Sequence, residues 1–344
     1  MSIEYKPQLI AFEVTGQCQF NCSHCRSNAH GTGAGTGDGV ELTTLECKKI
    51  LVAIANYHKC TVVITGGEPM ERADLCDLLR YAKGLGLRTA LATCGYLMDE
   101  MMMKRFKALD VTTLSLTLDG ATERKHDTFR RTPGAFHAVI KTAELAKKSG
   151  MRFQVNTTVN RGNLDQVKEV AALAESMGAY CFNPYIMLPT GKESRLEDQT
   201  LGPIEYEVLL NDLYVIKQNF PVEVRVSCGP QFARVSKPIG AERRLGVGCL
   251  GGREHAFITH RGQVQTCGYL PLSAGNLLEN EFDFEDIWEN AGLFEAMRSR
   301  KDLPETCQTC DHGQDCGGCR ARAYALSGDP MGADSLCSRL SDSV

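Results

Sequence analysis

Three cysteines near the beginning of the sequence, Cys18, Cys22 and Cys25, have the residue type and the spacing to bind metal. Their C-x3-C-x2-C pattern places three thiolates in one short loop. Structural zinc sites usually have four ligands on paired C-x2-C hooks. A [4Fe–4S] cluster that is held by only three cysteines leaves one iron open to an outside ligand. The spacing therefore favours a cluster with an open iron over a structural zinc site.

A second group of cysteines lies towards the end of the sequence and has the pattern C-x2-C-x5-C-x2-C-x17-C. Two further cysteines precede this pattern, and the second of them follows Gly262 by five residues. From spacing alone, zinc and iron–sulfur clusters are equally favoured, because two C-x2-C hooks also suit tetrahedral zinc. The whole group consists of Cys249, Cys267, Cys307, Cys310, Cys316, Cys319 and Cys337.

The composition restricts the class of protein. The 344 residues include 16 cysteines and carry a formal net charge of −4. A secreted disulfide scaffold is usually short and has a cleavable leader, and the polar first residues do not resemble one. No apolar run is long enough for a membrane span, and the weak charge gives no reason to expect a nucleic-acid partner. We therefore expect a cytoplasmic protein in which clustered cysteines bind metal, while lone cysteines such as Cys76 are small apolar residues.

Alternating strand-like and helix-like segments occupy the first half of the sequence. Thr43 and Glu46 form a capping-box pattern that predicts the start of one helix. Repeated strand–helix units imply parallel strands with right-handed crossovers. Six units are too few for a closed eight-fold barrel, so the pattern favours an α/β fold, either a partial (β/α)6 barrel or a doubly wound sheet. The expected strands are 9–14, 61–64, 88–93, 113–118, 153–159 and 180–188, and further helices are expected over 204–218 and 284–299.

Polar motifs follow these strands, at the ends where α/β folds place their chemistry. The first cysteine loop follows the first strand, and Gly66-Gly67-Glu68-Pro69 follows the second. Glycines allow a ligand to approach the backbone, and a carboxylate is a suitable partner for an ammonium group. Further polar residues at later strand ends are Thr93, Thr117, Arg130 and Asn156.

The cysteine loop together with the Gly66–Pro69 motif resembles the radical S-adenosylmethionine (SAM) superfamily. The resemblance implies that Cys18, Cys22 and Cys25 hold a [4Fe–4S] cluster whose open iron binds SAM. One electron from the cluster then cleaves SAM into methionine and a 5′-deoxyadenosyl radical. By the same resemblance, Gly66, Gly67, Glu68 and Pro69 receive the methionine amino group, and His24 packs near SAM. Weaker matches give SAM contacts to Thr93, Thr117, Asn156 and Arg130, the last pairing with the SAM carboxylate.

The C-terminal cysteines resemble the SPASM extension, which carries auxiliary [4Fe–4S] clusters. This likeness favours iron–sulfur clusters over zinc and implies two or three clusters in total. The last hook is C-x2-C here, whereas the family usually has C-x3-C. Cys228 is a candidate for a missing fourth ligand or for a substrate contact. The implied sets are Cys307, Cys310, Cys316 and Cys337 for one cluster, and Cys249, Cys267 and Cys319 for a second. The expected division is 1–200 for the barrel, 201–235 for a connecting region and 236–344 for the SPASM domain.

Several segments also resemble radical SAM enzymes that modify tetrapyrroles, especially heme b synthases. They include Cys267-Gly-Tyr-Leu-Pro271 and the stretch from Cys316 to Tyr324. The resemblance implies oxidative decarboxylation of two propionates of Fe-coproporphyrin III to vinyl groups. Arg26 is the preferred cation for a substrate carboxylate, because arginine pairs with carboxylates through two hydrogen bonds. An external low-potential donor, such as flavodoxin or ferredoxin, is expected to supply electrons.

Other functions remain open at this point. The nearest alternative is removal of side chains from a siroheme-derived or heme d1 precursor. A SPASM maturase that modifies a peptide is less favoured, because the cluster motif begins at Cys18 and leaves no room for a peptide-recognition domain before it. An electron carrier or a zinc-binding interaction protein has no need of the Gly66–Pro69 motif.

Overall fold

Six parallel strands form the centre of the computed structural model, which describes residues 4–26, 41–190, 196–236 and 248–343. All six predicted strands are confirmed, with boundaries that differ by no more than a few residues. Neighbouring strands follow the order of the chain, whereas a doubly wound sheet would reverse its order at one point. The partial-barrel alternative is therefore correct. The strands are β1 (Leu9–Glu13), β2 (Thr61–Thr65), β3 (Arg88–Thr93), β4 (Val111–Thr117), β5 (Phe153–Val159) and β6 (Cys181–Ile186).

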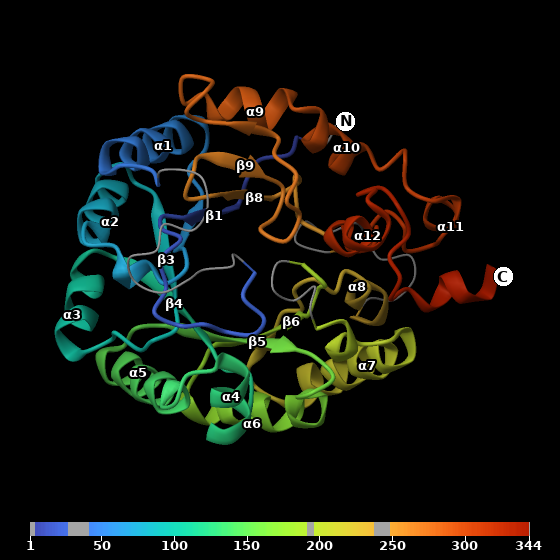
Figure 1. The fold of residues 1–344 in the computed structure, drawn as a ribbon, viewed down its shortest axis with the longest axis horizontal. Helices are drawn as coiled ribbons and strands as arrows, with labels where there is room; N and C mark the ends of the chain where they lie inside the picture. The colour runs from blue at the N-terminus through green and yellow to red at the C-terminus, as the bar shows by residue number, and fades with distance from the viewer. Residues whose placement is uncertain (1–3, 27–40, 191–195, 237–247, 344) are drawn as a thin grey trace.

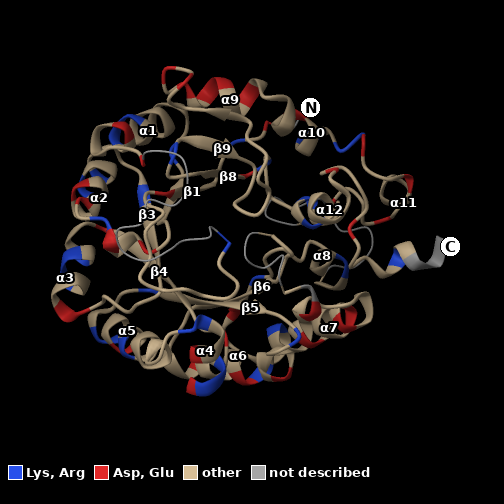
Figure 2. Ribbon diagram, viewed as in Figure 1, with Lys and Arg blue, Asp and Glu red and all other residues tan. Residues whose placement is uncertain are grey.

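Helices cover the outside of this curved sheet (Figure 1). The predicted capping box is present, because the Thr43 side chain accepts from the Glu46 backbone and the Glu46 side chain accepts from the Thr43 backbone. Lys, Arg, Asp and Glu lie mainly on these helices, whereas the strands carry few charges (Figure 2). The helices are α1 (Thr44–Tyr57), α2 (Leu75–Gly84), α3 (Glu100–Ala108), α4 (Glu123–Arg130), α5 (Ala135–Ser149), α6 (Val167–Met177) and α7 (Pro203–Asn219).

The sheet continues beyond the six repeats, which the sequence did not reveal. Four short strands extend it to ten, in the order β10-β9-β8-β1-β2-β3-β4-β5-β6-β7. The C-terminal strand β8 pairs in parallel with β1, so the segment expected to form a separate small domain contributes to the barrel sheet. The outer strands β7 and β10 do not pair, and the barrel stays open. These strands are β7 (Glu223–Val224), β8 (His255–Ile258), β9 (Gln263–Gln265) and β10 (Gly275–Asn276).

The predicted helix over 284–299 is two helices. The backbone at Ala291 is extended (φ −69°, ψ 127°) and separates α9 (Phe284–Asn290) from α10 (Gly292–Ser299). The break lets both Trp288 and Phe294 pack in the core, with ring centroids 5.0 Å apart. Short helices complete the C-terminal half: α8 (Phe232–Ser236), α11 (Glu305–Gln308) and α12 (Arg320–Ser327).

A continuous apolar core lies between the strands and the outer helices. Phe12, Ile64 and Leu116 are fully buried on β1, β2 and β4. Burial of such large side chains contributes about 1.5–3 kcal/mol each and dominates the stability of the barrel. None of the helices in the described part of the chain has the length and apolar character needed to cross a bilayer.

Candidate active site

The first cysteine loop lies directly after β1 and brings its three thiols together. Cys18 and Cys22 are almost fully buried. Burial raises the pKa of the Cys18 thiol to about 12, and the nearby Glu68, Cys22 and Cys25 also raise it. Cys18 and Cys22 belong to one buried cluster, and Cys25 packs against it. A bound metal cluster would reverse this pKa shift, because a coordinating thiol loses its proton.

The glycine motif after β2 packs against this loop. Gly67 N–H donates to the Thr15 carbonyl at 2.8 Å, and Glu68 N–H donates to the Gln17 carbonyl at 2.7 Å. A Cβ atom on Gly67 would lie only 2.2 Å from the Gln17 carbonyl oxygen, so no other residue fits. The motif and the cysteine loop are therefore one rigid unit.

The Glu68 carboxylate is buried and is used inside the protein. One of its oxygens accepts from Thr93 Oγ1 at 2.8 Å and from Met70 N–H at 3.1 Å. The other accepts from Cys94 N–H at 2.7 Å. Both oxygens thus hold the end of β3 in place, and the contact of Glu68 with the SAM amino group stays a prediction.

Asp119 organises the other side of the loop from the end of β4. It is completely buried and accepts from Arg130 Nε at 2.7 Å and from Thr158 N–H at 2.8 Å. The Arg130 guanidinium, expected to pair with the SAM carboxylate, is thus paired with Asp119, and its Nη1 lies 3.8 Å from Cys22 Sγ. Asp119 was not singled out from the sequence, because its partners Arg130 and Thr158 lie on other elements.

His24 packs between α4 and Asp119. Its ring stacks on Phe129 with centroids 3.9 Å apart and planes at 2°, and its Nε2 lies 3.5 Å from Asp119. Burial lowers the pKa of His24 to about 3, so the ring is neutral. His24 thus packs against α4, and its packing near SAM stays a prediction.

The remaining predicted SAM contacts lie at neighbouring strand ends. Thr117 is directly opposite Asn156 in the β4–β5 register, and Thr93 lies opposite Leu116 in the β3–β4 register. Asn156 Oδ1 accepts from Gln154 Nε2 at 2.9 Å. These residues share the carboxyl edge of the sheet, where parallel-strand enzymes hold their ligands.

Arg26 connects the cysteine loop to the C-terminal region. Its Nη2 donates to Glu13 at 3.0 Å, its Nη1 donates to the Gly268 carbonyl at 3.0 Å, and its guanidinium lies over the Phe257 ring. Glu13 also accepts from His260 Nδ1 at 2.7 Å. Burial acts to raise the pKa of Glu13, but Arg26 and His260 outweigh it and hold that pKa below its usual range. A substrate carboxylate at Arg26 would have to compete with Glu13.

Four cysteines from distant parts of the chain form a second group. Burial raises the pKa of the Cys228 thiol well above its usual value, and Cys319, Cys267 and Cys249 add to this shift. Burial likewise raises the pKa of the Cys267 thiol, and Cys249 and Cys319 add to this shift. Cys228 has a left-handed backbone (φ 57°), which is uncommon outside glycine and asparagine. The structure thus brings Cys228 to the other three predicted ligands.

Another four cysteines form a third group nearer the surface. Burial raises the pKa of the Cys307 thiol, and Cys337 and Cys310 contribute to the shift. Burial also raises the pKa of the Cys316 thiol, and Cys337 contributes to that shift. The two cysteines of the last C-x2-C hook therefore belong to different groups. Cys316 lies in the third group and Cys319 in the second.

A buried ion pair joins these elements. Arg322 Nε donates to Asp334 at 2.7 Å, and Arg322 Nη2 donates to the Cys228 carbonyl at 3.0 Å. Asp334 also accepts from the Cys319 backbone N–H at 2.6 Å. The pair fixes the backbone on both sides of the second group, and nothing in the sequence distinguished these two residues from surface charges.

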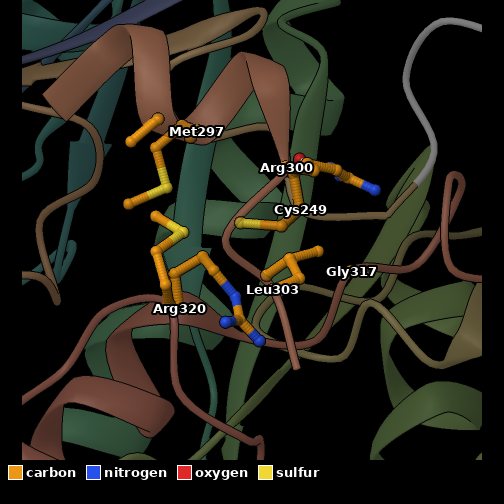
Figure 3. Close-up of a pocket in the computed structure, with 9 residues that line it drawn as sticks. Cys249, Met297, Arg300, Leu303, Gly317 and Arg320 are labelled. Carbon is orange, nitrogen blue, oxygen red and sulfur yellow. The ribbon is translucent and has the colours of Figure 1, made fainter. Parts of the chain in front are cut away.

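A small cavity lies beside Cys249, between α10 and the cysteine loops (Figure 3). Its volume is about 10 Å³, enough for roughly one water molecule and too small for a substrate. Arg320 Nη2 is buried there without a partner among the described residues, and Arg300 Nη2 lies 3.5 Å from the Cys249 carbonyl.

The three groups fit clusters better than single metal ions. Within the described residues, no set of three or more His, Cys, Asp or Glu side chains is close enough to hold one ion. An iron–sulfur cube holds its thiolates farther apart than a zinc ion does, because each thiolate binds a different corner. In the first loop, Gln19 Oε1 and His24 Nδ1 are also buried without partners, as expected where a bound group completes the site.

Comparison with known proteins agrees with this geometry. Residues 12–174 match the model of the radical SAM superfamily. An AdoMet-dependent heme synthase of Oleidesulfovibrio alaskensis is 36% identical over 96% of this chain and 87% of its own length. The chain belongs to the radical SAM superfamily. A second AdoMet-dependent heme synthase, from Methanosarcina barkeri, is 34% identical over 96% of both chains.

The C-terminal half of this radical SAM protein is also assigned. Residues 249–311 match the SPASM model, an iron–sulfur cluster-binding domain. Streptococcus suis SuiB bound to S-adenosylmethionine superposes with a TM-score of 0.77 at 17% identity, covering 96% of this chain and 77% of that chain. The family therefore supplies [4Fe–4S] clusters and SAM as cofactors, and iron–sulfur rather than zinc for the C-terminal cysteines.

Proposed function

We propose that the chain is a heme-forming radical SAM enzyme that converts two propionates of Fe-coproporphyrin III to vinyl groups, giving heme b. The observation that carries this proposal is the set of three relatives named AdoMet-dependent heme synthase, which are 34–36% identical over 96% of the chain. We also propose a cytoplasmic location, because clustered cysteines in a long chain are more typical of metal binding in a reducing compartment than of a secreted disulfide scaffold.

Three cluster sites would serve this reaction. Cys18, Cys22 and Cys25 would hold the cluster that binds SAM. The second group, completed by Cys228, and the third group would hold one auxiliary cluster each. Support for Cys228 as the fourth ligand comes from its mutual electrostatic influence on Cys249, Cys267 and Cys319. The second group is as follows: Cys228, Cys249, Cys267 and Cys319; the third is Cys307, Cys310, Cys316 and Cys337.

The protein's own residues position and shield the chemistry. The reduced cluster with SAM supplies a 5′-deoxyadenosyl radical. Backbone carbonyl groups of Gly66 and Gly67 would receive the SAM ammonium, since Glu68 is occupied in holding β3. Asp119 neutralises Arg130 beside Cys22 and keeps that side of the loop fixed. Thr117 and Asn156 would contact the sugar of SAM, and their adjacent positions at the carboxyl edge of the sheet support this.

The stoichiometry explains the need for further redox centres. Each propionate loses one hydrogen atom to the radical, then CO₂ and one electron, to give a vinyl group. One electron therefore enters and one leaves for each SAM that is cleaved. Gly268, whose carbonyl accepts from Arg26, follows Cys267 of the second group. A cluster in the second group would therefore be a suitable acceptor for the departing electron.

An anaerobic assay with SAM, a chemical reductant and Fe-coproporphyrin III tests the proposal. We expect heme b together with two equivalents of 5′-deoxyadenosine for each heme. Deoxyadenosine without any change in the porphyrin would contradict the substrate and would direct attention to siroheme-derived tetrapyrroles or peptides. Absence of deoxyadenosine with every substrate would contradict the radical mechanism itself.

A further inference from the structure

Arg320, the first residue of α12, is buried beside the last C-x2-C hook. Only 5% of its surface is exposed. Its Nη1 donates to the Gly332 carbonyl at 2.8 Å and to the Pro330 carbonyl at 3.1 Å, which holds the guanidinium in place. Its Nη2 has no hydrogen-bond partner among the residues that the structure describes. One donor group of a buried cation is therefore left for a partner that these residues do not provide.

The hook leaves room for this side chain because its two middle residues are glycines. A Cβ atom on Gly318 would lie 2.5 Å from Arg320 Nη2, and a Cβ atom on Gly317 would lie 2.8 Å from the Arg300 guanidinium. Arg300 and Arg320 line the same small cavity (Figure 3). Two guanidinium groups thus lie against the turn that joins the third group of cysteines to the second.

An arginine lies close to each cysteine of the third group. Arg339 Nη1 is 3.5 Å from Cys310 Sγ. Burial raises the pKa of the other three thiols, and an arginine opposes each of these shifts, because a nearby positive charge favours the thiolate. The pairs are Arg320 with Cys307, Arg300 with Cys316 and Arg234 with Cys337.

Two arginines near the cysteines are neutralised by carboxylates. Burial raises the pKa of the Cys228 thiol, and Arg322, which opposes this shift, is paired with Asp334 at 2.7 Å. In the third group, Arg234 is paired with Glu207. The arginine beside the second group therefore brings its own counter-charge.

Arg320 and Arg339 have no such counter-charge. Neither forms an ion pair within the part of the chain that the structure describes, since Arg320 donates to backbone carbonyl groups and Arg339 lies against a thiol. Asp311 and Asp315 lie in the same cysteine loop, but both are at least partly exposed, where water and salt screen a charge. The charge of the buried Arg320 is screened much less. Arg320 therefore adds a positive charge to the third group that the paired Arg322 does not add to the second.

We infer that Arg320, together with Arg339 nearer the surface, sets the reduction potential of a [4Fe–4S] cluster in the third group above that of a cluster in the second group. The inference rests on the cluster sites of the proposed function. A cluster gains one negative charge when it is reduced, so a fixed cation and a hydrogen bond to its sulfur atoms stabilise the reduced form. One electron shared between the two groups would therefore leave the second oxidised and the third reduced, with no bond formed or broken.

A redox titration of the full-length, cluster-loaded protein tests this role. Electron paramagnetic resonance follows the reduced clusters under anaerobic conditions, without SAM or porphyrin. The signals lost in Cys310→Ala and in Cys267→Ala are assigned to the third and the second group. We expect the third-group signal to appear at the higher potential. Arg320→Gln should make reduction of that cluster about tenfold less favourable, which corresponds to about 59 mV for one electron.

Three further variants separate charge from structure. Arg320→Lys keeps the charge and should recover most of the difference. Arg339→Gln should shift the same signal in the same direction but by less, because its charge is exposed. Arg105→Gln removes an arginine from α3, on the far side of the barrel (Figure 1), and should leave every potential unchanged.

Equal third-group potentials in Arg320→Gln and the wild type would overturn the inference. A third-group signal at or below the second-group potential, or a wild type without the signal that depends on Cys310, would overturn it as well. If Arg320→Gln does not retain its cluster, Arg339→Gln decides, and an unchanged potential there contradicts the inference. Potentials in the expected order, in a protein that makes no heme b, would support the inference and contradict the proposed substrate.

Discussion

Single buried polar residues hold the first cysteine loop in one arrangement. Glu68 joins the ends of β2 and β3, and Asp119 joins the loop to α4 and β5. Both carboxylates are almost completely buried, where an unmade hydrogen bond is costly. Both carboxylates therefore fix the positions of neighbouring strand ends and of the loop.

The variant Glu68→Gln should weaken SAM binding strongly. An amide NH₂ would face either the Cys94 N–H or the Thr93 hydroxyl, so one donor would lose its acceptor at a cost of about 1–3 kcal/mol. We expect the Kd for SAM to rise about tenfold or more, as measured by equilibrium binding under anaerobic conditions. Glu46→Gln makes the same chemical change on the exposed start of α1 and should leave the Kd unaltered. A wild-type Kd in Glu68→Gln would show that the carboxylate does not position the motif.

His126 should make the fold sensitive to acid. Its Nδ1 accepts from the Asp119 N–H, and burial lowers the pKa of His126 to about 4. The unfolded chain takes up a proton near pH 6.5, so between pH 6.5 and 4 the unfolded state binds more protons and stability falls as pH falls. We expect a loss of about 2 kcal/mol at pH 5 relative to pH 7 from this group.

Urea unfolding at a series of pH values measures this loss. The variant His126→Asn keeps an acceptor but cannot titrate, and its free energy of unfolding should decline less between pH 6.5 and 5. Parallel curves for the two proteins would mean that His126 is not the group responsible.

Among the elements, the contact between the first loop and the C-terminal strands is the one that the sequence concealed. The chain from Arg26 to Gly268 spans most of the protein, and the pairing of β8 with β1 brings them together. A four-residue strand such as His255–Ile258 has no periodic signal, so its place in the sheet is set by tertiary packing. In contrast, the longer strands and their helices follow from periodicity and caps.

Removal of Arg26 should destabilise the protein even without substrate. Arg26→Leu would leave Glu13 buried with only His260 as a partner, and loss of one member of a buried pair costs about 3–5 kcal/mol. The double variant Arg26→Leu/Glu13→Gln should recover part of this loss. Urea unfolding of the three variants without substrate provides the cycle. If Arg26 serves only as a substrate contact, Arg26→Leu will unfold like the wild type.

For the molecule as a whole, the cysteine spacing alone did not divide the C-terminal cysteines into sets, whereas the SPASM resemblance implied the two sets that the structure groups together. Cys316 and Cys319 are neighbours in the sequence, yet the start of α12 at Arg320 and the Asp334 contact direct them to different groups. The sequence left Cys228 between a fourth ligand and a substrate contact, because the cysteines it approaches lie at least twenty positions away along the chain. The contacts of Arg130 and His24 with Asp119 were not predicted either, because Asp119 is distant from both in sequence.

Iron analysis tests the division into three sites. The anaerobic wild type should hold about twelve iron atoms, four for each cluster. Cys228→Ala should lower the iron content toward eight, because the second group would lose a ligand. Cys76→Ser, a change at a lone cysteine on α2, should leave the iron content as in the wild type. Full iron in Cys228→Ala, with an unchanged spectrum of the reduced clusters, would exclude Cys228 as a ligand.

The left-handed backbone at Cys228 implies that the thiol is retained against the preference of the chain. A side chain with a Cβ atom costs about 1 kcal/mol or more in this conformation, and glycine avoids that cost. Cys228→Gly should therefore give a cluster-free polypeptide more resistant to denaturant than Cys228→Ala, although neither retains the sulfur. Glycine would suit the backbone conformation at this position better, but only cysteine supplies a thiol there.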